Sequence, residues 1–352
     1  MGPYKVKALR LVFLLRYLVL DIFFSEFMNN VKKKFVYFAS KLFSPSDRLI
    51  TLKMSESLCG VPFLSDANFF IPYRDSNEKV DEYGDVAKNI FNADIKSLLL
   101  SDMLICRIDG MSYDSGVGFE IGFCFGKQIP IVVFSLDFYD SSVNSKKIAY
   151  SPMLSEIAHC PKFQYSPSNP CGYKDQLKEN IEQFLSFINK ELSSPVYYYP
   201  KYLFDFSKRN NNKYDVFIDF SGLKYEWCRI LIDKVSYAFS DSKISFWVSS
   251  RYHNNYTSSE DIESLCSSRI YFICLDESEP NFDSSIIEGI AYSMNKYIVG
   301  YESQQVIRYV ENKQKMGINL MNEKSCSYIA SSLDDAISHI KSTITVLNGN
   351  SN

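Results

Sequence analysis

The segment of the chain most able to do chemistry is a short acidic run with two glycines, Asp114-Ser-Gly-Val-Gly-Phe-Glu120. It follows the continuous apolar run 103–108, which has the length of a strand, and it precedes an apolar helical stretch. In open parallel sheets, ligands bind beyond the carboxyl ends of the strands. Gly116 and Gly118 would let the backbone approach such a ligand closely. Carboxylates held at this point are therefore candidates for a nucleophile and an acid.

The charge state of these carboxyl groups decides what they can do. Asp109 lies just upstream, and we expect it to gather with Asp114 and Glu120. Like charges close together raise a carboxyl pKa, so one member of such a cluster can stay protonated and act as an acid. We also expect Glu120 in the first turn of the following helix, where the helix dipole favours an ionised carboxylate. The alternative is a solvated acidic loop that only caps that helix.

Composition argues against several other kinds of protein. The chain has 352 residues, is 46% apolar and carries a formal charge of −3, which fits about two folded domains without the basic excess of a nucleic-acid binder. It has 3 His, and its 9 Cys form no CxxC pair, so neither a metal centre nor a disulfide framework is indicated. We therefore expect no metal, no cofactor, free thiols and a cytoplasmic location.

The N-terminal stretch 9–24 is strongly apolar, but Arg16 and Asp21 interrupt it. A membrane-spanning helix needs about 20 apolar residues, so no transmembrane span is expected. No small-residue cleavage site follows, which argues against a signal peptide. A packed apolar helix within 1–32 is the favoured interpretation. The alternatives are a segment that binds a membrane surface or a regulatory partner, and a natural start at Met28.

The rest of the chain alternates apolar strand-like runs with amphipathic helical stretches, which predicts parallel βαβ units. Strands are expected at 35–39, 68–72, 103–108, 130–134, 214–220, 244–248, 269–275 and 297–301. Helices are expected at 46–59, 85–100, 119–127, 173–191, 225–238, 259–267, 286–294 and 328–345.

The chain also repeats itself. Residues 94–109 align without a gap to residues 261–276, at an offset of 167 residues, and six of the sixteen positions are identical. This predicts a tandem duplication, that is, two Rossmann-like or flavodoxin-like parallel-sheet α/β domains. The expected parts are the N-terminal helix 1–32, a first domain 33–191, a linker 192–212, a second domain 213–346 and a tail 347–352.

Four pieces of the first domain, in this order, resemble the nucleoside 2-deoxyribosyltransferases and the related nucleotide N-glycosidases. The resemblance covers about residues 35–135, and the acidic run is its most specific part. The pieces are Tyr37-Phe-Ala-Ser40, Asn92-Ala-Asp94, Asp114-Ser-Gly-Val-Gly-Phe-Glu120 and Gly122-Phe-Cys-Phe-Gly126-Lys127.

The resemblance implies a role for each matching residue. Glu120 would be the nucleophile that attacks C1′ of the sugar, and Tyr37 would hold its carboxylate by a hydrogen bond. Asp94 and Asp114 would contact the base and help to protonate the leaving nitrogen. Ordinary strand packing for Tyr37 and a surface carboxylate for Asp94 are the alternatives. The candidate substrate-binding residues are Ser40, Asn92, Asp109, Gly116 and Gly118.

The implied substrate is a nucleoside or a nucleotide, with NAD as a further candidate, and the acceptor is a second base (transfer) or water (hydrolysis). Two biological uses fit, a toxin-like effector in bacterial anti-phage defence and nucleoside salvage. The alternative outside enzymes is a non-catalytic module that senses a nucleotide or binds a protein. No GxGxxG fingerprint follows the first strand, so a dinucleotide-binding motif is not indicated.

The second domain lacks this pattern. Its first strand has Phe217 and no Tyr, and its loop, Asn281-Phe-Asp-Ser-Ser-Ile-Ile-Glu288, has no glycine. With Lys296 set against Lys127, Glu288 sits one position early, which turns a helical side chain by about 100°. We interpret this half as a degenerate copy. A ligand-sensing pocket and a second active site are the alternatives.

The resemblance also implies that the pocket is completed from outside. Family members use C-terminal residues of a neighbouring subunit, often an Asn. Either the degenerate copy supplies that face here, or a homo-oligomer or another protein does. The sequence does not show which Asn would serve, and Asn144 is a poor candidate.

Overall fold

The computed structural model describes residues 33–76, 86–109, 113–135, 141–143, 146–148, 151–157, 163–164, 173–192, 212–220, 225–252, 258–275, 281–302, 308–309, 315–316 and 319–349. The expected N-terminal helix 1–32, almost all of the expected linker 192–212 and Asn144 lie outside these ranges. Within them, no helix is long and apolar enough to cross a membrane. We call 33–192 the first half and 212–349 the second half.

The first half is built on a sheet with the strand order β2-β1-β3-β4-β7, in which every neighbouring pair is parallel. Alternate residues of a strand face opposite sides. Val36 and Phe38 therefore pack under helices α2 and α7, whereas Tyr37 and Ala39 face the other way, toward α5. The strands are β1 (Phe35–Ala39), β2 (Asn68–Phe70), β3 (Met103–Arg107), β4 (Ile131–Ser135) and β7 (Phe163–Gln164). The helices are α2 (Pro45–Leu58), η1 (Pro62–Leu64), α3 (Pro72–Asp75), α4 (Val86–Leu100), α5 (Ser115–Lys127), α6 (Pro152–Ile157) and α7 (Tyr173–Leu192).

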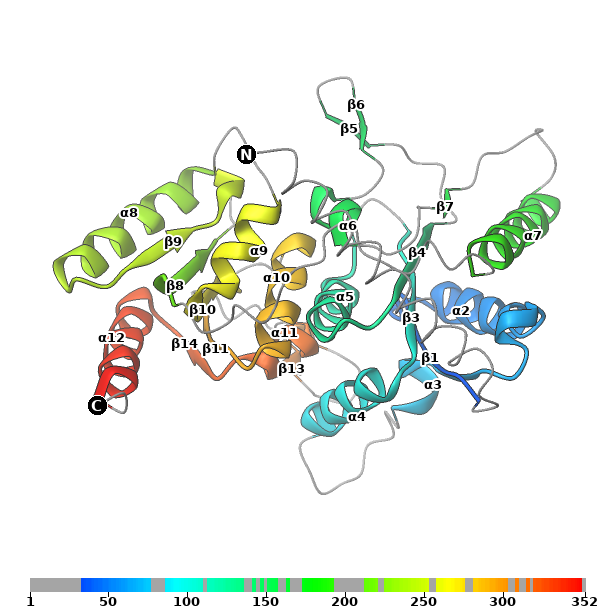
Figure 1. Ribbon diagram of the computed structural model, residues 1–352, viewed down its shortest axis with the longest axis horizontal. Coiled ribbons are helices and arrows are strands. Elements are labelled where there is room, and N and C mark those ends of the chain that lie inside the picture. Colours follow the sequence, from blue (N-terminus) through cyan, green and yellow to red (C-terminus); the bar gives the residue numbers. More distant parts are fainter. Residues whose placement is uncertain are drawn as a thin grey trace, which may run out of the picture.

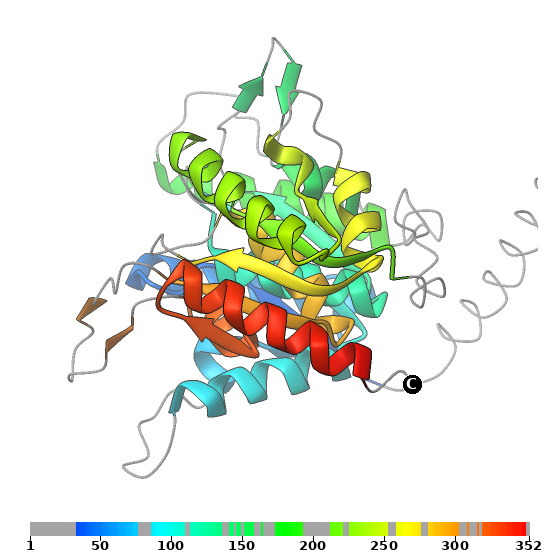
Figure 2. The ribbon, with the colours of Figure 1, turned by 90° about the vertical axis from the view of Figure 1, so that its left-hand side faces the viewer.

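The second half repeats this topology. Its sheet has the order β9-β8-β10-β11-β14, again with parallel neighbours only, so strand by strand it matches the first sheet. Seen from outside in Figure 2, α8 and α12 cover the face of this sheet that is turned away from the first half. The strands are β8 (Tyr214–Asp219), β9 (Phe246–Val248), β10 (Ser268–Cys274), β11 (Tyr297–Tyr301) and β14 (Tyr328–Ala330). The helices are α8 (Tyr225–Asp241), η4 (Ser250–Tyr252), α9 (Ser258–Cys266), α10 (Phe282–Ser293), α11 (Leu320–Ser325) and α12 (Leu333–Gly349).

Two small antiparallel hairpins complete the described strands. They pair β5 (Ser141–Val143) with β6 (Lys146–Ile148), and β12 (Arg308–Tyr309) with β13 (Lys315–Met316). The predicted fold class is confirmed, since two doubly wound parallel sheets follow one another in the chain.

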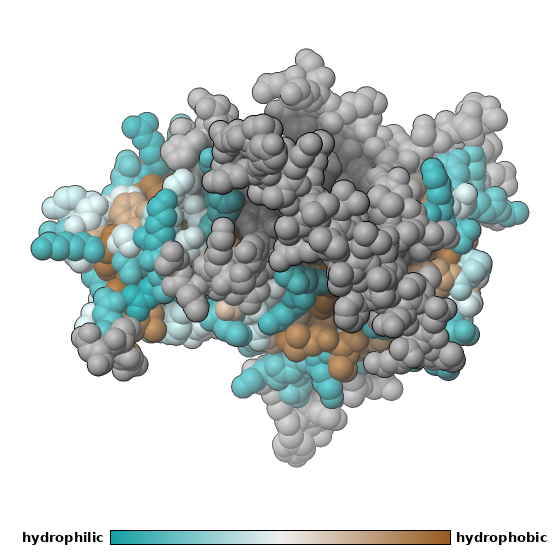
Figure 3. Space-filling view, in the orientation of Figure 1, coloured by the Kyte–Doolittle hydropathy of each residue, from teal (hydrophilic) through white to brown (hydrophobic). Residues whose placement is uncertain are grey.

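On the face shown in Figure 3, apolar surface gathers over α4, whose end exposes Leu99 and Leu100.

The two halves meet through α5 and α10, which lie side by side in the middle of the molecule (Figure 1). A Cβ atom on Gly122 would lie 1.9 Å from the carbonyl oxygen of Ile286, and one on Gly289 would lie 2.0 Å from that of Phe119. Only glycine permits backbones to approach this closely. Adding 167 to Gly122 and Phe119 gives Gly289 and Ile286, so the contact is reciprocal, as in a two-fold dimer interface.

This interface extends along both helices. Gly118 faces Phe282 and Ser285 near the start of α10, and Gly126 faces Ser293 at its end, so the two helices run in the same direction. One apolar core continues across the contact, because side chains of α5, α10 and the inner faces of both sheets belong to a single cluster.

The structure corrects the predicted start of α5. The helix begins at Ser115 and not at Phe119, because the side chain of Asp114 caps it by accepting from the backbone N–H groups of Gly116 (2.8 Å) and Val117 (3.3 Å). The two glycines of the acidic run therefore belong to the helix and not to a loop.

The predicted closing helix 328–345 is wrong in its first part. Tyr328–Ala330 is the strand β14, which pairs with β11, and the helix α12 starts at Leu333. Ser332 caps the start of α12, because its Oγ accepts a hydrogen bond from the N–H group of Asp335 at 3.1 Å. The short elements α6, α11 and β7 were not predicted, because they carry too few residues to show a period.

Candidate active site

A buried tyrosine and a buried glutamate form the centre of the candidate site. The hydroxyl group of Tyr37, on β1, donates a hydrogen bond to Oε1 of Glu120, on α5. Tyr37 is fully buried and Glu120 is 5% exposed. The hydrogen bond expected from the resemblance is present, and the ring of Tyr37 stacks on that of Phe70 with centroids 5.2 Å apart.

The electrostatics of Glu120 differ from the expectation. It lies in the second turn of α5, and burial raises its pKa well above the ordinary value, with further upward effects from Asp94 and Asp114. The hydrogen bond from Tyr37 acts in the opposite direction. The predicted stabilisation of the ionised form by the helix dipole does not prevail, because removal from water outweighs it.

Asp94 completes this group from α4. It is 4% exposed and accepts a hydrogen bond from Oγ of Ser76. Its charge raises the pKa of both Tyr37 and Glu120, so it lies within electrostatic reach of both. A surface carboxylate, the alternative for this residue, is therefore excluded.

Asp109 is held elsewhere. Its Oδ2 forms an ion pair with Nε of Arg107 at 3.0 Å, and its Oδ1 accepts from Oγ of Ser135 at 3.3 Å. Arg107 also pairs with Asp47 on α2, at 3.0 Å. Residues 107 and 109 follow the side of β3 that faces α2, opposite to the side of Tyr37. The predicted cluster of Asp109, Asp114 and Glu120 is thus corrected: Asp94 takes the place of Asp109.

Two other candidate binding residues also point away from Glu120. Oγ of Ser40 lies 2.6 Å from Oγ1 of Thr51 on α2, so its side chain belongs to the α2 side of the sheet. Asn92 is exposed on α4, because two residues along a helix are separated by about 200° and Asp94 faces inward. The structure does not bring either residue to the carboxylates.

The two glycines of the acidic run serve the contact between the halves. A Cβ atom on Gly118 would lie 2.9 Å from the carbonyl oxygen of Phe282 in α10. A Cβ atom on Gly116 would lie 3.0 Å from Oδ1 of Asn319. The backbone at these glycines therefore lies close to the second half, where a close approach to a ligand was expected.

Asn319 is the site residue that sequence reasoning missed. Its Oδ1 caps α11 by accepting from the N–H group of Met321 at 3.0 Å, and its Nδ2 donates to Oδ1 of Asp114 at 3.4 Å. The available signal was an Asn directly before a short amphipathic turn, which marks a helix start.

A similar but not equivalent contact exists on the other side of the interface. Ser151 precedes α6 as Asn319 precedes α11, and its side chain forms a hydrogen bond with Asp283 of α10. Each half thus sends the residue before a short helix toward the helix N-terminus of the other half. In the first half the group that crosses the interface is an amide, and in the second half it is a hydroxyl group.

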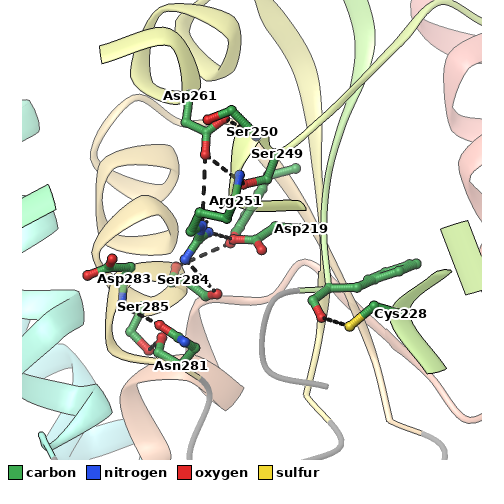
Figure 4. A network of polar contacts seen from close by, with 12 residues as sticks. Asp219, Cys228, Ser249, Ser250, Arg251, Asp261, Asn281, Asp283, Ser284 and Ser285 are labelled. Atoms are coloured by element: carbon green, nitrogen blue, oxygen red, sulfur yellow. Dashed lines mark hydrogen bonds and ion pairs between the residues drawn. The ribbon is translucent and has the colours of Figure 1, made fainter. Parts of the chain in front are cut away.

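The corresponding place in the second half holds a buried ion pair (Figure 4). The guanidinium group of Arg251 binds the fully buried Asp219 and donates to Oγ of Ser284 at 3.2 Å. The hydroxyl group of Tyr271 donates to Asp219 at 3.1 Å. Asp261, aligned with Asp94, accepts from Oγ of Ser249 at 2.6 Å.

Glu288 does not face this ion pair. It is fully buried, and its carboxylate accepts from Asn322, from Ser325 (2.8 Å) and from Cys326 (3.7 Å), all on or next to α11. Burial raises its pKa to about 8. Among the described residues, no group of three or more His, Cys, Asp or Glu is placed to hold a metal ion.

Comparison with models of protein families gives a match to part of the first half. The model of the family "Nucleoside 2-deoxyribosyltransferase" matches residues 36–156, the part that contains Tyr37, Asp94, Asp114 and Glu120. No curated protein sequence matches the chain.

Similarity to solved structures is remote. A conserved protein from Enterococcus faecalis V583 is 24% identical, with 44% of this chain and 99% of that chain covered and a TM-score of 0.32. The 2-deoxyribosyltransferase from Bacillus psychrosaccharolyticus is 17% identical, with 40% and 95% covered and a TM-score of 0.30. On the match of the family model, residues 36–156 in the first half of this chain are similar to the nucleoside 2-deoxyribosyltransferases.

Proposed function

We propose that the first half cleaves the N-glycosidic bond of a nucleoside or nucleotide, with Glu120 as the nucleophile. The observation that carries this proposal is the buried hydrogen bond between Tyr37 and Glu120, within reach of Asp94 and Asp114. A carboxylate held in one orientation by a hydroxyl group, with further carboxyl groups beside it, is the equipment of a retaining glycoside cleavage.

The reaction has two steps. An oxygen atom of Glu120 forms a bond to C1′ of the sugar while the bond from C1′ to the base nitrogen breaks, and the electron pair of that bond goes to the base. The base leaves with a proton on that nitrogen. A second base or a water molecule then attacks C1′ and displaces the carboxylate of Glu120. The proton that the attacking nitrogen or oxygen loses returns to the carboxyl groups of the site, and the step gives transfer or hydrolysis.

The carboxyl group of Glu120 supplies the proton for the first step, because its pKa is raised. Burial and the neighbouring carboxylates keep Glu120 protonated in the empty site at a pH where an isolated carboxyl group is ionised. We propose that Asp94 or Asp114 takes this proton when substrate binds and passes it to the departing base. One proton held by three carboxyl groups thus serves both the activation of the nucleophile and the release of the base.

The second half takes the part of a neighbouring subunit in this proposal. The pseudo-two-fold contact of α5 with α10 places Asn319 against Asp114 within one chain. An amide that donates to Asp114 fixes the orientation of this carboxylate. Asn319→Ala is expected to lower the turnover by about tenfold. The matched change on the other side of the interface, Ser151→Ala, is expected to leave turnover unchanged.

The test is product analysis over a mixed pool of deoxynucleosides, deoxynucleotides and NAD. Mass spectrometry is expected to detect free base with the wild-type chain and none with Glu120→Gln. Glu56→Gln, a change of the same chemistry at an exposed position of α2, is the control. Base release that persists in Glu120→Gln would exclude Glu120 as the nucleophile. Binding without turnover across the pool would favour the sensing module.

Two further measurements define the use of the reaction. An added free base that appears in a new nucleoside identifies transfer, whereas free sugar identifies hydrolysis. Toxicity on expression in a bacterium, lost in Glu120→Gln, identifies an effector, and growth without toxicity favours salvage.

A further inference from the structure

The carboxylate of Glu288 is the buried acidic group that the proposed mechanism leaves unused. In the sequence it reads as a displaced counterpart of Glu120, and its side chain forms hydrogen bonds with α11. Its hydrogen-bond donors are the side chains of Asn322, Ser325 and Cys326. All three belong to α11 or to its C-cap.

The helix α11 is the element that carries Asn319. It has six residues, which is too short to be stable by itself, so its position depends on what it packs against. Met321 is buried in the core shared by both halves, and α11 contacts α4 and α5 of the first half. Asn322 and Ser325 turn toward α10, where Glu288 receives them.

A chain of contacts therefore connects Glu288, α11 and Asp114. Glu288 holds α11 through Asn322 and Ser325, α11 begins at its cap residue Asn319, and Asn319 donates to Asp114 at the start of α5. Without Glu288, Asn322 would keep its hydrogen bond to Oγ of Ser285 (3.2 Å) and Ser325 its bond to the carbonyl oxygen of Asn322 (3.0 Å). Loss of the buried acceptor still costs free energy and weakens the attachment of α11 to α10, so α11 would shift. A shift of a six-residue helix moves its cap residue with it.

We infer that Glu288 is a positioning residue for the first-half site, which anchors α11 and so places Asn319 against Asp114. In this inference the second half has a buried acidic group on α10, the helix that corresponds to α5, and this group stabilises the site of the first half. This inference rests on the proposed function, because Asn319 has a site to complete only if the first half is reactive.

The experiment compares variants of the full chain in two measurements, base release and amide hydrogen exchange. Glu288→Leu keeps most of the side-chain volume but removes the acceptors, and Glu288→Gln restores one acceptor. Ser325→Ala removes one donor. Ser268→Ala is its matched control, since Ser268 is also a buried serine but donates to a backbone carbonyl group, that of Ser264, away from α11.

The expected result has two parts. In Glu288→Leu, the amides of residues 320–326 exchange at least tenfold faster while those of α12 keep their rate, and turnover falls about tenfold. The double variant with Asn319→Ala is expected to be no slower than either single variant, because both act through the same contact. Glu288→Gln is expected to recover most of the turnover, and Ser268→Ala to resemble the wild type.

Each other outcome decides between the two proposals. Unchanged exchange over 320–326, or effects of Glu288→Leu and Asn319→Ala that multiply, would overturn the role of Glu288 while the proposed function stands. A wild-type chain that releases no base, with exchange over 320–326 still faster in Glu288→Leu, would overturn the proposed function and leave only the anchoring of α11. If Glu288→Leu does not fold, Ser325→Ala against Ser268→Ala gives the same decision.

Discussion

The two halves place different chemistry at the same point of the same fold. In the first half, Tyr37 donates to a glutamate whose pKa is raised by burial and by nearby carboxylates. In the second half, a guanidinium group neutralises the buried Asp219. At this place the first half keeps a carboxyl group in an unfavourable environment, which is typical of reactive sites, whereas the second half pairs its buried Asp219 with a cation.

The difference can be followed residue by residue. Tyr37 lies opposite Leu104 in the first sheet, and at the corresponding register of the second sheet Phe217 lies opposite Tyr271. The hydroxyl group has thus moved to the neighbouring strand, where it binds Asp219. The two halves thus carry different side chains at a few corresponding positions of the same fold, while both take part in the same close contact between α5 and α10.

The interface itself is expected to show the largest effect. Gly122→Ala would place a Cβ atom 1.9 Å from a backbone oxygen of α10, so the two halves would have to separate. We expect a loss of at least about 3 kcal/mol in the free energy of unfolding, measured by urea denaturation. Gly349→Ala, in α12, meets nothing within 4 Å and is the control, with a change within about 1 kcal/mol. Equal stability of the two variants would contradict the close helix contact.

The second-half ion pair should be structural and silent in catalysis. Arg251→Met leaves the buried Asp219 without its partner, which costs about 3–5 kcal/mol of stability. Arg74 corresponds to Arg251, because it lies four residues after Phe70 as Arg251 lies four residues after Trp247. Arg74→Met removes a half-exposed pair with Asp75 and should cost less than about 1 kcal/mol. Thermal denaturation checks both values. Base release per folded molecule should remain at the wild-type level in Arg251→Met, and a selective loss would show that this ion pair takes part in the reaction.

The raised carboxyl pKa values predict how stability depends on pH. Glu288 keeps its proton in the folded chain up to a pKa of about 8, whereas in the unfolded chain it loses it near the ordinary value of 4.5. The folded state therefore binds more protons in this window, and the free energy of unfolding falls as pH rises, by up to about 1.4 kcal/mol per pH unit for this group.

Replacement of Glu288 by Gln should flatten this dependence. Glu120→Gln should do the same, because its pKa is raised in the same direction. Urea denaturation between pH 5 and 8 measures the slopes, with Glu56→Gln as the control. A slope unaltered in both variants would show that neither carboxyl group is held protonated in the folded chain.

The smallest expected effect, and the most direct comparison, comes from exchanging the two aromatic residues. Tyr37→Phe gives the first half the side chain that the second half has at this register, and it removes the hydrogen bond to Glu120. We expect turnover to fall roughly 10- to 100-fold, with a smaller change in KM, because the hydroxyl group orients the nucleophile. Phe217→Tyr should not create activity in a Glu120→Gln background, since Arg251 and Asp219 fill that site.

Much of the fold follows from local patterns in the sequence. The buried strands and the 167-residue repeat show two copies of one doubly wound sheet, because apolar periodicity and self-similarity are properties of the chain itself. The short elements α6 and α11 were missed, and so was the boundary between β14 and α12, because tertiary packing stabilises segments that are too short to carry a period of their own.

The sequence by itself indicated the candidate site residues that the first half contributes. The resemblance of four segments to a known family implied that Tyr37, Asp94, Asp114 and Glu120 share a site, and the lack of this pattern in the second half indicated a degenerate copy. The position after a buried strand indicated by itself only the acidic run with Asp114 and Glu120, because ligands bind beyond the carboxyl ends of parallel strands.

Tertiary structure alone decided the rest. Asp109 turned to Arg107, the glycines of α5 met α10, and Asn319, 205 residues along the chain from Asp114, came within hydrogen-bond distance of it. The pKa of Glu120 also depends on burial, which no local pattern specifies. Packing between segments far apart in the chain decides which side of the sheet the residues after a strand lie on. It also decides which surface of one half covers the other.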